Sequence, residues 1–427
     1  RAGQTPVPER YWSAKEAAEQ GARDPFTGNE ADAADRLDHL LRDAVRRRMV
    51  ADVPLGAFLS GGIDSSTVVA MMQAQSSRPV KTFSIGFHEA GYDEAVHARA
   101  VARHLGTDHT ELYVSSDQAL GVIPRLPALY DEPFADSSQI PTFLVSELAR
   151  RHVTVSLSGD GGDELFGGYN RYFLGRKIWR AIGWVPRRAR ASVASGLTLL
   201  SPATWSAVLG RVSAGVADVT HPGDKLHKLA GILDSPDADS MYLGLVSHWP
   251  QPATIVEGAT EPPTALVDRS QWAELSDFTA RMMYLDLVTY LPDDILVKLD
   301  RASMGVSLEA RVPLLDHRVV EFAWRLPLSM KIAGDTGKPA LRRVLDRYVP
   351  RKLIDRPKMG FGVPIDAWLR DPLREWAESL LDERRLRKEG FFRPEPIRAR
   401  WQEHLSGRRN WQYLLWDVLM FQAWLDQ

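Results

Sequence analysis

A run of small and acidic residues near the start of the chain has the composition of a phosphate-binding loop. It lies between an apolar run and an apolar helical pattern and reads Ser60-Gly61-Gly62-Ile63-Asp64-Ser65-Ser66. Gly61 and Gly62 allow a tight turn that brings backbone N–H groups close to an anion, and a helix beginning near Ser65 would add its positive end. The three serines offer hydroxyl donors, while Asp64 suits Mg²⁺, which prefers oxygen ligands together with phosphate.

The spacing distinguishes this loop from two common phosphate-binding motifs. The Walker loop ends in Gly-Lys-Ser/Thr and the dinucleotide fingerprint needs a third glycine before the helix, and this loop has neither feature. We therefore expect a loop that grips pyrophosphate and supports cleavage of ATP between its α and β phosphates. The alternative is a plain helix cap, in which Asp64 or Ser65 accepts hydrogen bonds from first-turn N–H groups.

The composition is that of an ordinary globular protein and limits the classes of partner. Of 427 residues, 44% are hydrophobic and 25% are charged, with 53 Lys and Arg against 55 Asp and Glu. This balance argues against disorder and against nucleic acid as the main partner. The chain has no cysteine, which excludes disulfides, Cys-ligated zinc and a thiol nucleophile within these residues. Since no apolar run reaches the roughly 18 residues of a membrane helix, we expect no membrane partner and a cytoplasmic location.

Extended and helical patterns alternate along the first part of the chain. Short apolar strands are expected at 56–59, 81–87, 109–114 and 153–157, and helices at 30–49, from 65, and at 94–105, 118–130 and 139–152. The alternation predicts an α/β fold with a mostly parallel sheet wrapped by helices, followed by an additional helical C-terminal region. Ligands of such sheets bind at the carboxyl ends of the strands.

A second glycine-rich acidic loop directly follows the fourth expected strand. It reads Ser158-Gly159-Asp160-Gly161-Gly162-Asp163-Glu164. Because the carboxyl ends of parallel strands meet at one edge of a sheet, both acidic loops are expected at that edge.

Four ordered motifs resemble the synthetase domain of glutamine-dependent asparagine synthetases, over about Arg10 to Trp424. They are Thr82-Phe83-Ser84-Ile85-Gly86-Phe87, Ser158-Gly159-Asp160-Gly161-Gly162-Asp163-Glu164-Leu165-Phe166-Gly167-Gly168-Tyr169, Glu309-Ala310-Arg311-Val312-Pro313-Leu314-Leu315-Asp316 and Arg356-Pro357-Lys358-Met359-Gly360-Phe361-Gly362. The resemblance implies the adenine nucleotide α-hydrolase (PP-loop) fold and an ATP- and Mg²⁺-dependent carbon–nitrogen ligase. Such an enzyme forms β-aspartyl adenylate from L-aspartate, which ammonia attacks to give L-asparagine, AMP and pyrophosphate.

Within the nucleotide site, the resemblance places Leu59 and Ile85 along the adenine. It puts Ser158 and Gly159 near the α-phosphate or the ribose. The loop from Ser60 to Ser66 would then hold the phosphates.

The resemblance also assigns the chemistry. Asp64 and Asp163 match the family's magnesium ligands, since two carboxylates from separate strand ends can clamp a metal that bridges phosphates. Lys338 and Lys358 match a pair of lysines expected to stabilise the charge of the adenylation and amidation transition states. Asp160 stands where many members have glutamate, and is expected to orient the amine or to accept its proton.

Charged residues before the third motif are candidates for the acid substrate. Asp294, Lys298 and Asp300 would contact its ammonium and carboxylate groups, or would form an ion pair on a helix surface. Glu309 and Arg311 are expected to be an internal structural pair instead of catalytic groups.

Full-length members of the family begin with a glutaminase domain whose nucleophile is a cysteine. Since this chain lacks cysteine and begins at Arg1, we expect a piece of a longer protein. Residues 1–29 would be a linker from the missing glutaminase, 30–170 the ATP-binding core, and 171–427 a helical region that completes the active site. These residues alone would use free ammonia in place of ammonia derived from glutamine.

Other functions remain open on the same scaffold. Its relatives close β-lactam rings, cyclise lasso peptides or amidate sugar acids, because the adenylation of a carboxylate is separable from the choice of amine. A tRNA-modifying or guanylate-forming enzyme is more distant. An idle scaffold or regulatory binding module is disfavoured, since it has no need for Asp64, Asp163 and Lys358 together. The Trp-rich tail fits internal packing or a subunit contact, so a homodimer stays open.

Overall fold

A computed structural model describes residues 9–87, 93–202, 204–205, 208–209, 222–356 and 362–427. The chain divides into two compact units, each built from separate stretches of sequence. The first contains the described residues within 1–113, 145–172 and 264–358, and the second those within 114–144, 173–263 and 359–427. These units interleave along the chain.

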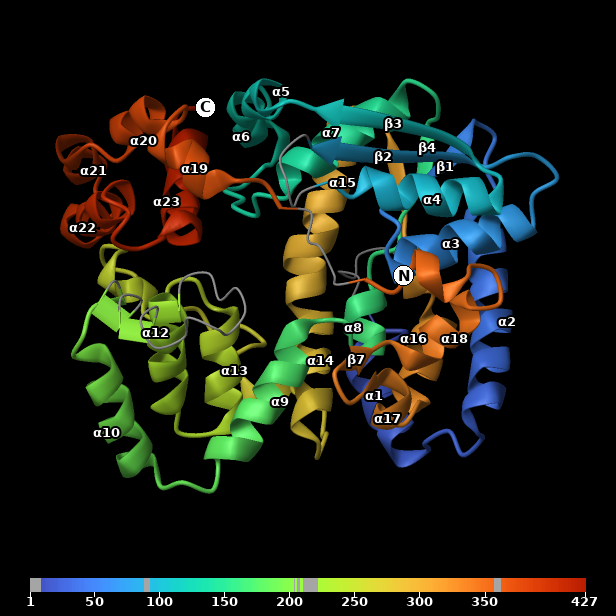
Figure 1. The fold of residues 1–427 in the computed structure, drawn as a ribbon, viewed down its shortest axis with the longest axis horizontal. Coiled ribbons are helices and arrows are strands. Elements are labelled where there is room, and N and C mark those ends of the chain that lie inside the picture. The colour runs from blue at the N-terminus through green and yellow to red at the C-terminus, as the bar shows by residue number, and fades with distance from the viewer. Residues whose placement is uncertain (1–8, 88–92, 203, 206–207, 210–221, 357–361) are drawn as a thin grey trace, which may run out of the picture. The chain divides into compact units, whose positions relative to one another are not determined.

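A five-stranded sheet forms the centre of the first unit, with the strand order β3-β2-β1-β4-β5 (Figure 1). Its strands are β1 (Leu55–Phe58), β2 (Lys81–Phe87), β3 (Asp108–Val114), β4 (Val155–Leu157) and β5 (Glu309–Arg311). Strand β1 pairs in parallel with β2 and with β4, and β4 pairs in parallel with β5. The α/β fold with a mostly parallel sheet is therefore confirmed.

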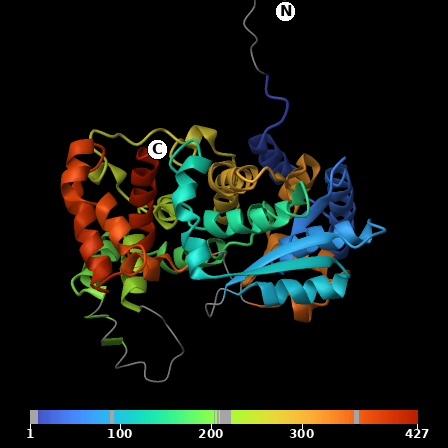
Figure 2. The same ribbon diagram turned by 90° about the horizontal axis from the view of Figure 1, so that it is seen from above.

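Helices of the first unit surround this sheet. They are α1 (Ala14–Arg23), α2 (Glu30–Arg48), α3 (Ile63–Ala74), α4 (Ala95–Leu105), α8 (Gly162–Phe166), α14 (Phe278–Val288), η4 (Leu291–Ile295), α15 (Leu296–Met304), η5 (Pro313–Leu315), α16 (His317–Arg325), α17 (Leu328–Lys331), α18 (Pro339–Leu345), with the short turns η3 (Arg269–Gln271) and η6 (Arg351–Leu353). Helix α4 lies along β2 (Figure 2). A two-stranded ribbon, β6 (Ile332–Ala333) and β7 (Thr336–Gly337), precedes α18.

Helix α2 shows how the sequence determines one of these elements. The Asn29 side chain caps its first turn, and the Asp32 carboxylate accepts a hydrogen bond from the backbone N–H of Asn29, which satisfies otherwise unpaired N–H groups. Leu37, Leu41 and Val45 lie four residues apart and are fully buried, so one face of the helix packs into the core. The helix ends in three arginines, the favoured charge for a C-terminus.

The second unit is largely helical. It contains α5 (Ser116–Leu120), η1 (Ile123–Arg125), α6 (Leu126–Leu129), α10 (Arg187–Thr198), α12 (Pro222–Leu233), α13 (Ala238–Val246), η2 (Pro252–Thr254), α19 (Ile365–Arg370), α20 (Arg374–Leu380), α21 (Glu383–Glu389), α22 (Pro394–Leu405) and α23 (Gln412–Leu425). Two further helices, α7 (Gln139–Arg150) and α9 (Asn170–Ile182), begin in one unit and end in the other. In the tail, Trp401 and Trp416 are fully buried, as expected for core residues. None of the helices in the described ranges has the length and apolarity needed to cross a membrane.

One expected element was wrong, and one strand was not predicted. The helix expected over 118–130 is three short pieces, α5, η1 and α6, because Pro124 and Pro127 begin new helical turns and cannot continue a hydrogen-bonded helix. The fifth strand, β5, was not predicted, since it is only three residues long and contains two charged side chains. Glu309 and Arg311 do form a structural pair within it, at 2.7 Å between Oε1 and Nε.

Candidate active site

The two glycine-rich acidic loops meet at the carboxyl end of the sheet, as the sequence predicts. Strands β1 and β4 run side by side, with Ala57 opposite Leu157, so the loops that follow them are neighbours. A Cβ atom on Gly159 would lie 2.6 Å from the backbone nitrogen of Ser65, and one on Gly162 would collide with the carboxylate of Asp64. The close contact of the loops therefore requires glycine at both positions.

The first loop leaves the start of α3 open. Gly61 has φ +71°, and a Cβ there would lie 2.8 Å from the backbone of α4, so the turn depends on glycine. The hydroxyl groups of Ser60 and Ser65 are 3.0 Å apart, and Ser60 accepts from the N–H of Gly62 at 3.2 Å. Helix α3 begins at Ile63, and its cap residue, Gly62, provides no side-chain hydrogen bond. The cap position is therefore Gly62 and not Asp64 or Ser65, and a helix N-terminus with a glycine cap is suited to an anion.

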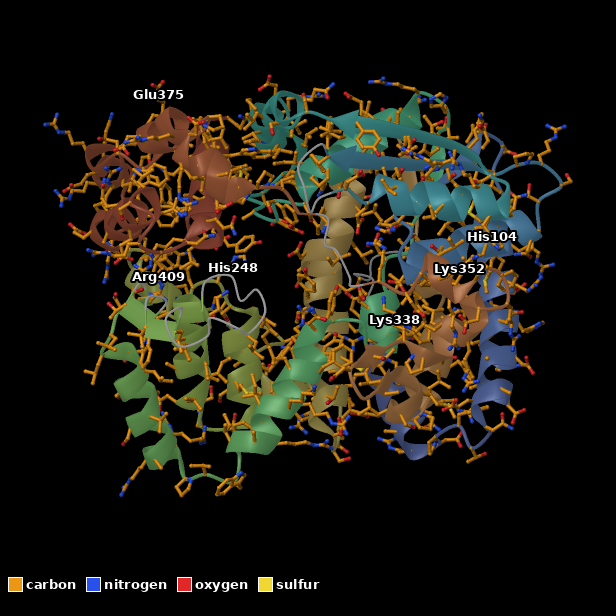
Figure 3. The ribbon with its side chains drawn as sticks, viewed as in Figure 1. His104, His248, Lys338, Lys352, Glu375 and Arg409 are labelled. Atoms are coloured by element: carbon orange, nitrogen blue, oxygen red, sulfur yellow. The ribbon has the colours of Figure 1, made fainter. Side chains whose placement is uncertain are left out.

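Lys338 joins the two loops through their carboxylates. Its Nζ lies 2.6 Å from Asp163 Oδ1 and also donates to Asp64 Oδ2. The Lys338 side chain is only 6% exposed, and it comes from a segment far along the chain (Figure 3). Burial by itself would lower the pKa of Lys338, but the negative charges of Asp163 and Asp64 raise it above its ordinary value. The ammonium group is therefore held protonated between two carboxylates.

The backbone at Lys338 is built to place this side chain. Lys338 has φ +64°, a left-handed conformation that costs a non-glycine residue roughly 1–3 kcal/mol. Its N–H donates to the carbonyl oxygens of Phe166 and Lys331, at 3.1 and 2.8 Å, and Pro339 then starts α18. A side chain at Gly168 would collide with both Lys338 and Asp163. These contacts stabilise a strained residue at the centre of the site.

The second loop holds Asp160 next to Ser158. The Ser158 hydroxyl donates to Asp160 Oδ2 and accepts from the Asp160 N–H at 3.4 Å. The N–H of Ser158 donates to the carbonyl of Arg311 in β5 at 2.8 Å, which ties the loop to the sheet. Gly161 has φ +88°, and a Cβ there would lie 2.5 Å from Leu315. The loop thus presents a carboxylate whose orientation is fixed by a hydroxyl donor.

A buried acid that the sequence analysis did not single out follows Asp163 directly. Glu164 accepts a hydrogen bond from the Tyr169 hydroxyl at 2.6 Å. Burial, and then the charge of Asp163, raises the pKa of Glu164 to about 7. The guanidinium of Arg171 lies over the Tyr169 ring, 4.1 Å from its centroid, and pairs with buried Asp286 at 2.8 Å. The only signal in the sequence was the position of Glu164 and Tyr169 within the second motif.

The expected adenine-site residues lie at neighbouring strands. Leu59 directly follows β1, its N–H donates to the carbonyl of Phe83 in β2 at 2.9 Å, and Ile85 lies in β2. Both Leu59 and Ile85 are buried, as are Ser66 and Ser158. Their contact with a nucleotide stays a prediction.

The remaining predicted residues lie on other elements or outside the described residues. Asp294 lies in η4 and Lys298 in α15, both half-buried, while Asp300 in α15 is exposed. Lys358 lies outside the described residues. A further cation, Arg356, belongs to the fourth motif, but no role in the site was predicted for it. Its Nη2 donates to the carbonyl of Ser60 in the first loop at 3.2 Å.

Asp64 and Asp163 have the chemistry for a divalent ion. Both lie in the first helical turn after a glycine-rich stretch, Asp64 in α3 and Asp163 in α8, and they converge on the single ammonium of Lys338, so their oxygens lie close enough to share one cation. No group of three or more acidic or histidine side chains suitable for a metal occurs in the described part of the chain. Two protein carboxylates completed by phosphate and water fit Mg²⁺, which keeps several waters when it binds with phosphates.

Comparison with known proteins identifies the family of the chain. The family model described as asparagine synthase matches residues 36–426. The chain belongs to this family. Among related proteins, a Mycobacterium tuberculosis protein provisionally named as a glutamine-hydrolysing asparagine synthetase is 35% identical over 98% of this chain and 61% of its own length. Asparagine synthetase 1 of Bacillus subtilis is 31% identical, over 90% of this chain and 57% of its own length. Amidase chyE of Penicillium rubens is 26% identical, over 82% of this chain and 55% of its own length.

The chain spans about three fifths of the length of the curated relatives that it matches first. The family assignment covers the described site, because both acidic loops and Lys338 fall within the matched residues.

Proposed function

We propose that this chain catalyses ATP-dependent amide formation on L-aspartate. In the first step, a side-chain carboxylate oxygen of aspartate forms a bond to the α-phosphorus, and the bond to the bridging oxygen breaks to release pyrophosphate. In the second step, ammonia attacks the acyl carbon and AMP leaves with the former carboxylate oxygen. The products are L-asparagine, AMP and pyrophosphate.

The observation that supports this proposal best is the buried cluster of Lys338, Asp64 and Asp163 beside the open start of α3. An uncapped helix N-terminus and a protonated lysine favour the negative charge of a phosphate chain. Lys338 is then positioned to stabilise the charge that develops on the departing pyrophosphate. Mg²⁺ held by Asp64 and Asp163 would neutralise further negative charge on the phosphates.

Asp160 is proposed as the group that orients the amine or takes its proton. A carboxylate that accepts from Ser158 is held in one orientation and keeps acceptor capacity for an incoming N–H group. Lys358 is proposed as the second cation of the reaction, by the resemblance of its motif. Leu59 and Ile85 are proposed along the adenine, with Ser158 and Gly159 at the α-phosphate or ribose. Asp294, Lys298 and Asp300 are proposed at the charged groups of aspartate.

The wider setting is also part of the proposal. In the parent protein, a glutaminase domain would supply ammonia from glutamine, whereas this chain alone would use free ammonia. The names of two relatives include glutamine hydrolysis, which supports a glutaminase domain in the parent protein. We place the reaction in the cytoplasm, and a homodimer remains compatible with the Trp-rich tail.

The assay combines the purified chain with ATP, Mg²⁺ and ammonium, with and without L-aspartate. Nucleotides are separated by chromatography, and asparagine is measured by mass spectrometry. We expect AMP and asparagine to form only with aspartate, and activity to be lost in Lys358→Ala. Lys352→Ala is the matched control, because Lys352 is an exposed lysine of the same stretch and should retain activity (Figure 3). Formation of ADP and phosphate would contradict the proposal.

A second candidate is a ligase of the same mechanism that acts on another carboxylate. It is favoured by the relative named amidase chyE, which matches 82% of this chain. The candidates include peptide cyclisation, β-lactam closure and sugar-acid amidation. If wild-type chain binds ATP but aspartate does not stimulate AMP formation, a screen of peptide, β-amino-acid and sugar-acid carboxylates would identify this activity.

A further inference from the structure

Arg356 connects the end of the 351–356 segment to the first acidic loop. Its Nη2 donates to the carbonyl oxygen of Ser60 at 3.2 Å and lies 3.7 Å from a carboxylate oxygen of Glu94, just before α4. The side chains of Arg356 and Glu94 are 14% and 9% exposed. The guanidinium is thus a mostly buried cation in contact with the predicted phosphate-binding loop.

The other two nitrogens of this guanidinium make no hydrogen bond to the described residues. Nε and Nη1 of Arg356 are buried, and neither has a hydrogen-bond partner among the residues that the structure describes. A buried donor left unsatisfied costs about 1–3 kcal/mol, and a guanidinium remains charged at every physiological pH. Nearby His97 adds no second positive charge, because burial, and then the charge of Arg356, lowers its pKa. The arrangement is therefore poor for stability and suited to an anionic ligand.

Arg356 also borders open space. It lines a cavity of about 720 Å³ formed by α18 and the 351–356 segment. Three other arginines that line this cavity each pair with a carboxylate: Arg342 with Asp355, Arg343 with Glu30, and Arg351 with Asp346. Arg356 differs from them, because it contacts the Ser60 loop and has two nitrogens without partners in the described structure.

We propose that Arg356 is a further residue of the nucleotide site, which holds the loop through the Ser60 carbonyl and donates from its two unpartnered nitrogens to a phosphate group of ATP. The choice of phosphate follows from the loop that Arg356 contacts and from the permanent charge of the guanidinium, whose N–H groups form strong hydrogen bonds to phosphate oxygens. The inference rests on the proposed ATP-dependent function and adds a residue to it. Lysine could supply the charge, but it would donate from one nitrogen only.

The test compares the binding of ATP, AMP and adenosine by calorimetry, with Mg²⁺ and without the acid substrate. Arg356→Gln should weaken ATP binding roughly 10- to 100-fold, as expected for a lost hydrogen bond to a charged group, while adenosine binding stays within about twofold. Arg356→Lys should fall between the wild type and Arg356→Gln. Arg343→Gln, at an exposed arginine of the same cavity, should leave all three affinities unchanged.

Three results would overturn the inference. One is ATP binding by Arg356→Gln within twofold of the wild type. Another is an equal loss for adenosine, which would show that Arg356 supports the fold around the base. The third is an equal loss in Arg343→Gln, which would assign the effect to the cavity as a whole. If melting shows that Arg356→Gln is unfolded, Arg356→Lys decides, since it must weaken ATP selectively. A wild-type chain that binds no ATP would instead contradict the proposed function itself.

Discussion

Replacing Lys338 by methionine tests the role of the buried cluster. Methionine has a similar shape but no charge, so Asp64 and Asp163 would face each other without a cation between them. Removing one partner of a buried ion pair typically costs about 3–5 kcal/mol, because the remaining charge is left uncompensated. For a unit of this size, that loss should lower the melting temperature by roughly 10 °C. The Lys338 side chain is 6% exposed, so solvent screening cannot offset much of the effect.

The same substitution should reduce catalysis more than stability explains. The loss of one preorganised donor to developing negative charge typically costs about 10²–10³ in kcat. Activity is measured as aspartate-dependent AMP formation at a temperature where circular dichroism shows the variant to be folded. Unfolding is followed by the same signal during heating.

A double variant separates the two effects. Lys338→Met combined with Asp163→Asn leaves one buried carboxylate instead of two, so part of the lost stability should return while activity stays low. Groups in direct contact should show a coupling of about 0.5–3 kcal/mol in this cycle. The reasoning is refuted if Lys338→Met melts within about 2 °C of the wild type and retains activity, or if the two substitutions are additive in stability.

Three further predictions concern the metal at Asp64 and Asp163 and the shifted pKa values of Lys331 and Glu164. Mg²⁺ without nucleotide should raise the melting temperature of Lys338→Met more than that of the wild type, because the Lys338 ammonium no longer competes for the carboxylates. Equal shifts would argue against a metal at Asp64 and Asp163. Burial lowers the pKa of Lys331 to about 7, so wild-type stability should fall as pH drops from 10.5 towards 7, by at most about 5 kcal/mol. Lys331→Met should remove this fall, as measured by urea unfolding at pH 9 and pH 7. The pKa of Glu164 is raised to about 7, so its contribution to stability should be lost as pH rises from 4.5 to 7. Glu164→Gln still accepts from Tyr169, and its free energy of unfolding in urea should rise relative to that of the wild type between pH 5 and pH 8.

The sequence predicts the positions of β1, β2, β3 and β4 to within two residues, because each is apolar and is bounded by a loop or a helical pattern. It also places the two acidic loops at one edge of the sheet, since parallel strands end on the same side. Strand β5 was not predicted, because its short charged segment is extended only through its pairing with β4, which is a tertiary contact.

The composition of the site was harder to predict than its location. The resemblance suggested Lys338 as a catalytic cation, but its contact with both carboxylates depends on a left-handed backbone and on the space at Gly168, which spacing does not reveal. The contact of Arg356 with Ser60 joins residues 296 positions apart, so no local sequence pattern predicts it. The roles of Asp294 and Lys298 stay predictions.

Isotope transfer from the acid substrate tests the central claim most directly. L-Aspartate labelled with ¹⁸O in its side-chain carboxylate is incubated with the chain, ATP, Mg²⁺ and ammonium, and the products are analysed by mass spectrometry. If the carboxylate is activated by adenylation, one labelled oxygen appears in AMP for each asparagine formed, and none appears in pyrophosphate. Label in inorganic phosphate, or asparagine formed with unlabelled AMP, would contradict the account.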